Sequence, residues 1–247
     1  MEKKGFTLAE SLMTLTIIGI VAILALPGLM ADKEITTLQA QLKRTYTELN
    51  DFAAYFQADH GTPISLWVSQ NGVGALQDEL KNYFAETHKV SDWRWGSSAS
   101  ERPYTMYAHY SNQTVTSPCD ATNMTSDLSG RTISFDDAPI EGYNGPRICV
   151  DINGSKKPNK YGVDIFSFLF TIEGGVIPDG LEHQKNYYDG QGIAWNAGAL
   201  RGESNCYDHE YGINCAYYAL NDINPKDKTK KYWSDYVKKQ KYLKSNK

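Results

Sequence analysis

One stretch of the sequence gathers the oxygen-bearing side chains that a hard cation prefers. It reads D-I-N-G-S-K-K-P-N-K-Y-G-V-D and contains Asp151, Asn153 and Asp164. Carboxylate and amide oxygens are the usual ligands of calcium. An EF-hand loop needs glycine at its sixth position and glutamate at its twelfth, and this stretch has neither. Calcium is therefore a candidate cofactor, and the alternative is a hairpin with turns at Asn153-Gly154 and Pro158-Asn159.

No set of residues predicts catalysis. The histidines lie near no nucleophile signature such as G-x-S-x-G, and the sequence has no phosphate-binding glycine loop. We therefore expect that the protein is not an enzyme and requires no cofactor. Several aromatic residues suit either a sugar-binding or base-stacking surface or ordinary packing on a sheet. They are Trp93, Trp95, Tyr187, Tyr188 and Trp195.

The last stretch, 226–247, differs in charge from the rest of the chain. It holds nine lysines and two aspartates, whereas the whole chain has a net charge of −4. A solvated basic tail or helix is one interpretation. The other is electrostatic contact with DNA, with aromatic residues stacking on the bases. The apolar residues that fall roughly on one helical face are Tyr232, Trp233, Tyr236, Val237 and Leu243.

The order of the predicted elements indicates an α+β fold. Residues 73–84 have the spacing of a short amphipathic helix, whereas later stretches are rich in β-branched and aromatic residues. We expect antiparallel strands over 103–110, 131–135, 147–152 and 163–172. The polar segment 111–129 is expected to be a long surface loop. Helices followed by strands are typical of the α+β class.

A long helix precedes these elements and is expected to end near residue 60. Apolar residues recur at spacings of three and four from Ile35 to Phe56, and only Thr45 interrupts them. Gly61 and Pro63 end the pattern. We expect this apolar stripe to pack on the sheet of the same chain. A free coiled coil is the alternative, although the stripe lasts only about three heptads.

Residues 6–30 are expected to form a transmembrane segment. No charged residue occurs from Ser11 to Met30. At about 1.5 Å per residue, this run spans about 30 Å, the thickness of the hydrocarbon core of a bilayer. Lys3 and Lys4 precede the run, which by the positive-inside rule keeps the N-terminus in the cytoplasm. The predicted location is therefore the inner membrane, with a single crossing and the globular part outside the cytoplasm.

Glu10 is a functional candidate because a carboxylate in an apolar run costs about a few kcal/mol without a partner. The sequence G-F-T-L-A-E from Gly5 to Glu10, after the short leader Met1–Lys4, resembles the prepilin signature of type IV pilins and type II secretion pseudopilins. The resemblance covers about thirty residues. A plain anchor or a secretory signal peptide is the alternative, but the apolar region of a signal peptide is shorter, about 7–15 residues.

The resemblance implies how the N-terminus is processed and used. A prepilin peptidase would cut between Gly5 and Phe6, and Phe6 would become the N-methylated terminus. The carboxylate of Glu10 would pair with the amine of a neighbouring subunit and set the register of a filament. Pro27 matches the helix-breaking proline of the family and would let the helix bend. A disulfide-closed loop near the C-terminus would resemble the region that varies among type IV pilins.

The four cysteines favour two disulfides over a metal site, because their number is even and the chain is expected to be exported. The favoured pairing is Cys119–Cys149 and Cys206–Cys215. Four cysteines allow three connectivities, so the other two pairings stay open.

These predictions divide the chain into a leader (1–5), a transmembrane and assembly helix (6–30), a globular domain (31–225) and a basic tail or helix (226–247). The predicted function is that of a bacterial filament subunit, minor or specialised, in a type IV pilus or type II secretion pseudopilus. Its expected partners are other pilin subunits, the prepilin peptidase and the inner membrane. A pilin-like binding module that captures DNA or glycan is the main alternative. An exported hydrolase is another, but the sequence offers no active site for it.

Overall fold

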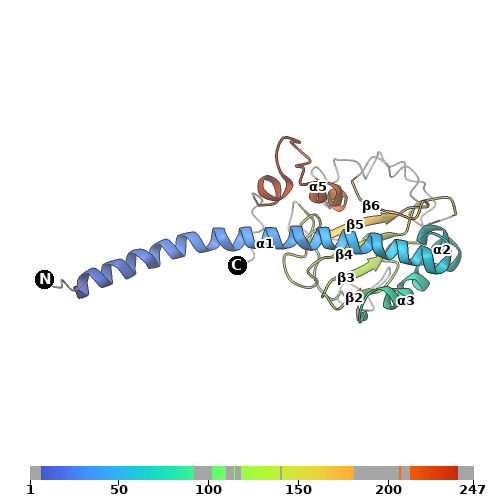
Figure 1. Cartoon of the computed structure of the whole chain (residues 1–247), viewed down its shortest axis with the longest axis horizontal. Coiled ribbons are helices and arrows are strands. Elements are labelled where there is room, and N and C mark those ends of the chain that lie inside the picture. The colour runs from blue at the N-terminus through green and yellow to red at the C-terminus, as the bar shows by residue number, and fades with distance from the viewer. Residues whose placement is uncertain are drawn as a thin grey trace. The chain divides into compact units, whose positions relative to one another are not determined.

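The structure, a computed structural model, describes residues 7–91, 102–109, 114, 118–139, 141–180, 206 and 212–238 (Figure 1). The chain divides into two compact units, Met1–Thr37 and Leu38–Lys247. We call them the N-terminal unit and the globular unit. Helix α1 (Leu8–His60) contributes its first part to the N-terminal unit and its second part to the globular unit.

In the globular unit, α1 buries the apolar stripe that its spacing predicts. Leu42 and Phe56 are completely buried, and Leu38, Leu49 and Phe52 are exposed by 3% or less. Two contacts place this stripe on the sheet, across which α1 lies in Figure 1. The ring of Tyr46 stacks on that of Phe168 at 5.8 Å, and the ring of Phe52 meets that of Phe170 edge-on at 5.9 Å. Burial against its own sheet therefore stabilises this half of the helix.

The sheet has six antiparallel strands in sequence order, so each strand pairs with the next one along the chain. This order needs no crossover connection. The strands are β1 (His88–Ser91), β2 (Met124–Ser126), β3 (Thr132–Phe135), β4 (Arg147–Asp151), β5 (Ile165–Phe170) and β6 (Val176–Pro178). The longest pairings join β4 to β5 and β3 to β4.

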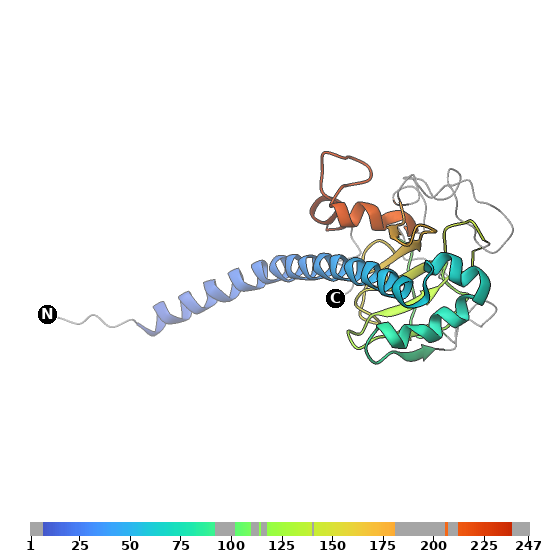
Figure 2. The same cartoon turned by 45° about the vertical axis from the view of Figure 1, so that its right-hand side comes forward.

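Short helices complete the globular unit. Helix α1 ends at His60. Gly61 follows in a left-handed conformation (φ +70°), and its N–H donates to the carbonyl of Gln57 at 2.9 Å. Helices α2 (Ile64–Asn71) and α3 (Val73–Tyr83) follow it and lie side by side in both views (Figures 1 and 2). Near the other end of the chain are η2 (Ile213–Cys215), α5 (Ala216–Asn221) and the π-type turn η3 (Tyr232–Val237).

Two buried arginines connect the sheet to its surroundings. Arg147 donates from Nε to Asp179 at 2.7 Å and from Nη1 to Asp136 at 3.3 Å. Arg131 donates from Nε to Asp127 at 2.8 Å and forms an ion pair with Glu48 of α1. Since a buried charge is stable only when paired, these contacts fix the strand ends relative to one another and to the helix.

The predicted α+β class is confirmed, and three strands lie where the residue types predict them, at β3, β4 and β5. The predicted strand over 103–110 is wrong. Of the described residues 103–109, only Tyr107 makes bridges, to Thr114 and Lys160. Apolar and polar residues alternate from Pro103 to Tyr110, and this pattern reflects the burial of Met106 and Ala108 without a strand.

The predicted surface loop over 111–129 is also corrected, because it contains β2. The three residues of β2 are buried although two of them are polar. The structure explains this through α3, since Nε2 of Gln77 donates to the hydroxyl of Thr125 at 2.9 Å. A tertiary hydrogen bond thus allows a polar strand to be buried.

Candidate functional site

Helix α1 begins with a capping box formed by Thr7 and Glu10. The backbone N–H and the hydroxyl of Thr7 both donate to Oε2 of Glu10 at 2.8 Å, and the N–H of Glu10 donates to the Thr7 hydroxyl at 3.2 Å. This reciprocal pattern pairs N–H groups that a helix start otherwise leaves without partners. Glu10 therefore has a structural role in its own chain that the sequence analysis missed, although T-x-x-E is a known capping signal.

The other predicted N-terminal positions are only partly described. Gly5 and Phe6 lie outside the described residues. Pro27 lies inside α1, which continues through it as one element. The side chain of Pro27 also lies outside the description, as do those of its neighbours over 25–29.

The first part of α1 exposes apolar side chains on every side. From Leu8 to Leu24, its large apolar residues are 52% to 80% exposed. At 100° per residue, neighbouring positions such as Ile17 and Ile18 point in different directions, so from Leu15 to Leu24 no face of this segment is polar. A helix of this kind needs another surface to cover it.

The prediction of a membrane crossing is contradicted. Among the residues described, no helix is both long enough and apolar enough to cross a membrane. Thr14, Thr16 and Gly19 interrupt the described apolar run. The transmembrane segment over 6–30, the single-pass inner-membrane location and the membrane partner are therefore corrected.

The second candidate site, at Asp151, Asn153 and Asp164, lies in the turn between β4 and β5. Asp151 is the last residue of β4 and pairs with Ile165, the first residue of β5. The carboxylate of Asp164 accepts the backbone N–H groups of Asn159 at 2.8 Å and Lys160 at 2.6 Å. The N–H of Asn153 donates to Oδ1 of Asp151 at 3.3 Å. These are the hairpin contacts of the alternative interpretation, so the turn folds by its own hydrogen bonds.

Glycine is required at one position of this turn. Gly154 has a φ of +67°, and a Cβ atom there would lie 2.1 Å from the carbonyl oxygen of Gly130. A side chain at this position would collide with the backbone of the neighbouring turn, between β2 and β3. The two turns therefore pack directly on one another.

The same turn contains buried oxygens without hydrogen-bond partners. Among the described residues, Oδ2 of Asp151 and Oδ1 of Asn153 are buried and accept no hydrogen bond. Asp151 is 2% exposed and Asp164 is completely buried. Burial raises the pKa of both carboxyl groups, and the negative charge of Asp164 raises the pKa of Asp151 further. Two carboxylates and one amide oxygen therefore lie where either a proton or a hard cation would stabilise them.

A metal site here would rely on neutral oxygens as well as carboxylates. Over the part of the chain that the structure describes, no group of three or more histidine, cysteine, aspartate or glutamate side chains is placed to hold a metal ion. Calcium accepts amide and backbone carbonyl oxygens as ligands, so two carboxylates with such oxygens suit it better than they suit zinc.

Both disulfides are present with the pairing that the sequence favoured, Cys119–Cys149 and Cys206–Cys215. The first attaches the segment before β2 to β4. The second attaches Cys206 to η2, and the hydroxyl of Tyr236 donates to the carbonyl of Cys206 at 2.7 Å. Of the residues between Cys206 and Gly212, none belongs to the described part of the chain.

The aromatic residues of the basic stretch are not available for stacking on bases. Tyr232, Trp233 and Tyr236 of η3 are buried in the globular unit. The Tyr232 hydroxyl donates to the carbonyl of Gly162 at 2.5 Å, and Nε1 of Trp233 donates to that of Ala219 at 2.8 Å. The hypothesis of base stacking by these residues is therefore corrected. Residues 239–247 lie outside the description, and so do the aromatic candidates Trp93, Trp95, Tyr187, Tyr188 and Trp195.

His109 is buried and serves packing. Its Nδ1 lies 2.7 Å from the carbonyl oxygen of Tyr161, and its ring stacks on Tyr236 at 5.2 Å. Burial lowers the pKa of His109 to about 4. The residue is therefore neutral at pH 7.

Comparisons with known proteins found no similarity to this chain. No family model matches it, and neither the curated proteins nor the solved structures include a match.

Proposed function

We propose that this chain is a structural subunit of a filament of the type IV pilus or type II secretion pseudopilus kind, assembled through its N-terminal helix. The observation that carries the proposal is the exposure of apolar side chains all around α1 from Leu8 to Leu24. The same segments of other copies would cover these side chains, because helices that are apolar on all sides pack against one another.

The globular unit supports the same proposal. The second half of α1 packs on an antiparallel sheet, as the pilin resemblance implies, and two disulfides cross-link the unit. Processing between Gly5 and Phe6 by a prepilin peptidase belongs to the proposal, because it creates the amine that Glu10 needs. The size of the globular unit, from Leu38 to Lys247, favours a minor or specialised subunit over a densely repeated one.

The capping box defines what Glu10 offers to a neighbour. Both hydrogen bonds from Thr7 go to Oε2, and among the described residues Oε1 has no partner. Oε1 would accept the N-terminal amine of the next subunit, while Oε2 keeps capping its own helix. One carboxylate would thus orient the helix start and set the register of assembly.

Mass spectrometry of the protein from the cells that make it tests the proposal. An N-methylated Phe6 terminus in a sheared, high-molecular-weight fraction is expected. An uncut Met1, or a monomeric protein with a terminus near Asp32, would contradict it.

Two matched variants separate the role of Glu10 in assembly from its role in capping. Glu10→Gln keeps an oxygen that caps the helix but removes the charge, so the assembled fraction should fall. Thr7→Ala removes the cap but keeps the charge, so assembly should largely persist. Equal losses in the two variants would show that capping alone explains Glu10.

A second proposal is that calcium binds the turn between β4 and β5. Its support is the pair of buried oxygens without partners, Oδ2 of Asp151 and Oδ1 of Asn153. Calcium should raise the melting temperature at pH 7.5 and less at pH 5, where the carboxyl group of Asp164, whose pKa is raised to about 7, is protonated. Asp151→Asn should abolish the shift, and Asp78→Asn, on the exposed face of α3, should not. If isothermal titration shows no heat of binding at millimolar calcium, the proposal is wrong.

A further inference from the structure

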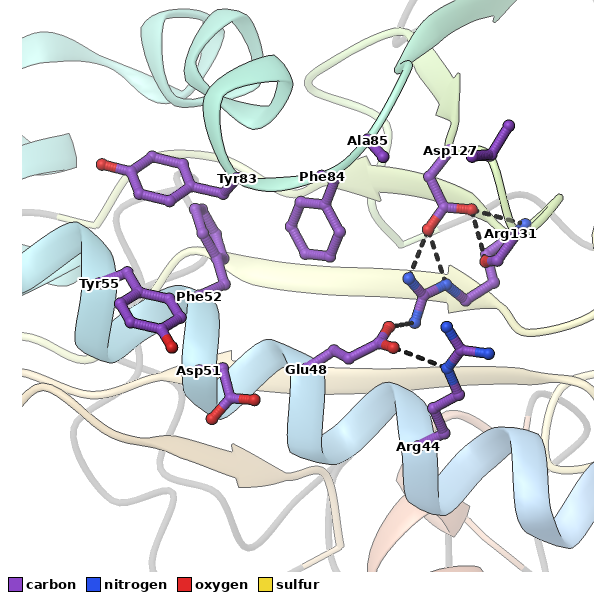
Figure 3. A pocket seen from close by; sticks show the side chains of 12 residues that line it. Arg44, Glu48, Asp51, Phe52, Tyr55, Tyr83, Phe84, Ala85, Asp127 and Arg131 are labelled. Carbon is purple, nitrogen blue, oxygen red and sulfur yellow. Dashed lines mark hydrogen bonds and ion pairs between the residues drawn. The ribbon is translucent and has the colours of Figure 1, made fainter.

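The globular unit has a hollow of about 490 Å³ between α1, the end of α3 and the turn between β2 and β3. Figure 3 shows that its two walls differ in chemistry. Aromatic rings form one wall, and charged side chains form the other. The aromatic residues are Phe52, Tyr55, Tyr83 and Phe84, and the charged ones are Arg44, Glu48, Asp51, Asp127 and Arg131.

The arginines of the charged wall are paired inside the hollow. Arg131 is held between Asp127 and Glu48, and Nε of Arg44 donates to Oε1 of Glu48 at 2.7 Å. With two arginines and three acids, the wall has one negative charge in excess. Asp51 is exposed and forms no hydrogen bond or ion pair with the described residues (Figure 3). The excess negative charge therefore lies at Asp51.

The aromatic wall is a preformed cluster in which Phe52 and Phe84 are buried and Tyr55 faces solvent. The ring of Phe52 lies 5.1 Å from that of Tyr83 and 5.3 Å from that of Phe84. Tyr55 and Leu128, which line the hollow, are 65% and 66% exposed. Aromatic rings next to an unpaired carboxylate favour a cation with an apolar stem, which is the chemistry of a lysine side chain.

The same unit carries an exposed group of lysines between α5 and η3. We call residues 226–231, with the sequence K-D-K-T-K-K, the basic loop. Its four lysines are exposed, and the turn is held in shape from within. The N–H of Lys230 donates to the carbonyl of Asp227 at 2.9 Å, which places Lys228 at the centre of the turn. Lys230 also pairs with Asp227. Lys228 is exposed at the centre of the turn, and we take it as the lysine of the proposed contact.

We propose that the hollow receives the basic loop of a second copy of this chain. The inference rests on the proposed filament function, because a head-to-tail contact that continues without closing needs two different and complementary surfaces on each subunit. The hollow and the basic loop are two such surfaces. The ammonium group of Lys228 pairs with Asp51, and its stem lies along Tyr55 and Leu128.

Carbodiimide cross-linking of the full chain in its assembled fraction tests this contact, because the reagent joins a carboxylate to an amine that touches it. A ladder of linked chains is expected, and peptide mass spectrometry should find Asp51 joined to a lysine of the basic loop. A ladder without this link would overturn the inference and leave the filament intact. The absence of any assembled fraction would instead count against the proposed function.

Charge reversal provides the second readout. Asp51→Lys should reduce the linked ladder by at least about tenfold, since like charges in an interface repel. Lys228→Asp should have the same effect, and the double variant should restore the ladder. Asp78→Lys, an equal change on the exposed face of α3, is the matched control and should change nothing. If Lys228→Asp reduces DNA binding and leaves the ladder unchanged, the basic loop serves DNA and the inference is wrong.

Discussion

Both parts of α1 carry large apolar side chains, but these side chains have opposite surroundings. Leu15 in the N-terminal unit is 66% exposed, whereas Leu42 in the globular unit is completely buried. The second part finds its partner in the sheet of its own chain. The first part has no such partner among the described residues of its unit. Under the proposed function, one helix would serve both folding and assembly.

Matched truncations on the two parts of α1 should give the largest difference. Leu42→Ala should lower the free energy of unfolding by about 3–5 kcal/mol, since the site is completely buried. Leu15→Ala should leave the unfolding of the globular unit unchanged and weaken assembly. Denaturant titration and sedimentation of the two variants measure these effects. Equal losses of folding stability would show that the two parts of the helix do not differ in role.

Acid should destabilise the globular unit through His109. The pKa of this buried histidine is lowered to about 4, below its ordinary value near 6.5, so its contribution is complete above about pH 6.5 and is lost as the pH falls towards 4. The loss is about 3 kcal/mol, from a shift of about 2.5 pKa units.

The variant His109→Asn isolates this effect from other acid-sensitive groups. Its difference in unfolding free energy from the original protein should shrink between pH 7 and pH 4. A constant difference would show that His109 is not buried in its neutral form.

Removing the charged link between α1 and the sheet should cost somewhat less. Arg131→Met leaves Asp127 buried without its charged partner. We expect the free energy of unfolding to fall by about 2 kcal/mol. Breaking a fully buried pair typically costs roughly 3–5 kcal/mol, and the loss is smaller here because Glu48 is partly exposed. Arg44→Met, in the exposed pair with Glu48, should cost at most about 1 kcal/mol. Thermal unfolding of both variants measures the contrast. Similar losses would mean that Arg131 does not fix α1 to the sheet.

The smallest expected effect is local to the start of α1. Thr7→Ala removes the capping box and should lower helix stability there by about 1 kcal/mol. Hydrogen exchange should quicken at the amides that follow Thr7, whereas the exchange of the buried sheet should not change. Thr14→Ala, which removes a hydroxyl within the helix, is the control. Unchanged exchange in Thr7→Ala would show that the cap contributes nothing in solution.

Local patterns in the sequence predicted those elements whose signal lies within a few residues. The stripe from Leu38 to Phe56, the end of the helix before Gly61 and the strands β3, β4 and β5 follow from spacing and residue type. The elements that were missed depend on partners far away in the sequence. Strand β2 is polar and is buried through Gln77 of α3, and the alternation near Tyr107 reflects burial without a strand.

The candidate sites show the same division. The sequence predicted that Asp151 and Asp164 lie close together, because a hairpin joins them. Only the folded structure shows that Oδ2 of Asp151 and Oδ1 of Asn153 are buried without a hydrogen-bond partner. The hollow beside Tyr55 gave no signal in the sequence, since its walls come from α1, α3 and the turn between β2 and β3. The apolar run over 11–30 predicted a membrane crossing that the described helix contradicts.

The sequence by itself determined where α1 starts and stops, which residues of its second part are buried, the α+β class and the favoured cysteine pairing. The hydrogen bonds of a helix and the spacing of its apolar residues involve positions that are close in the sequence, so the sequence predicts them. The tertiary structure alone decided that Tyr232, Trp233 and Tyr236 are buried and that Arg131, directly before β3, pairs with Glu48 of α1. It also decided that an acidic, aromatic hollow and an exposed basic loop occur on one globular unit. Such features depend on which distant segments meet, and that is set by packing over the whole sheet.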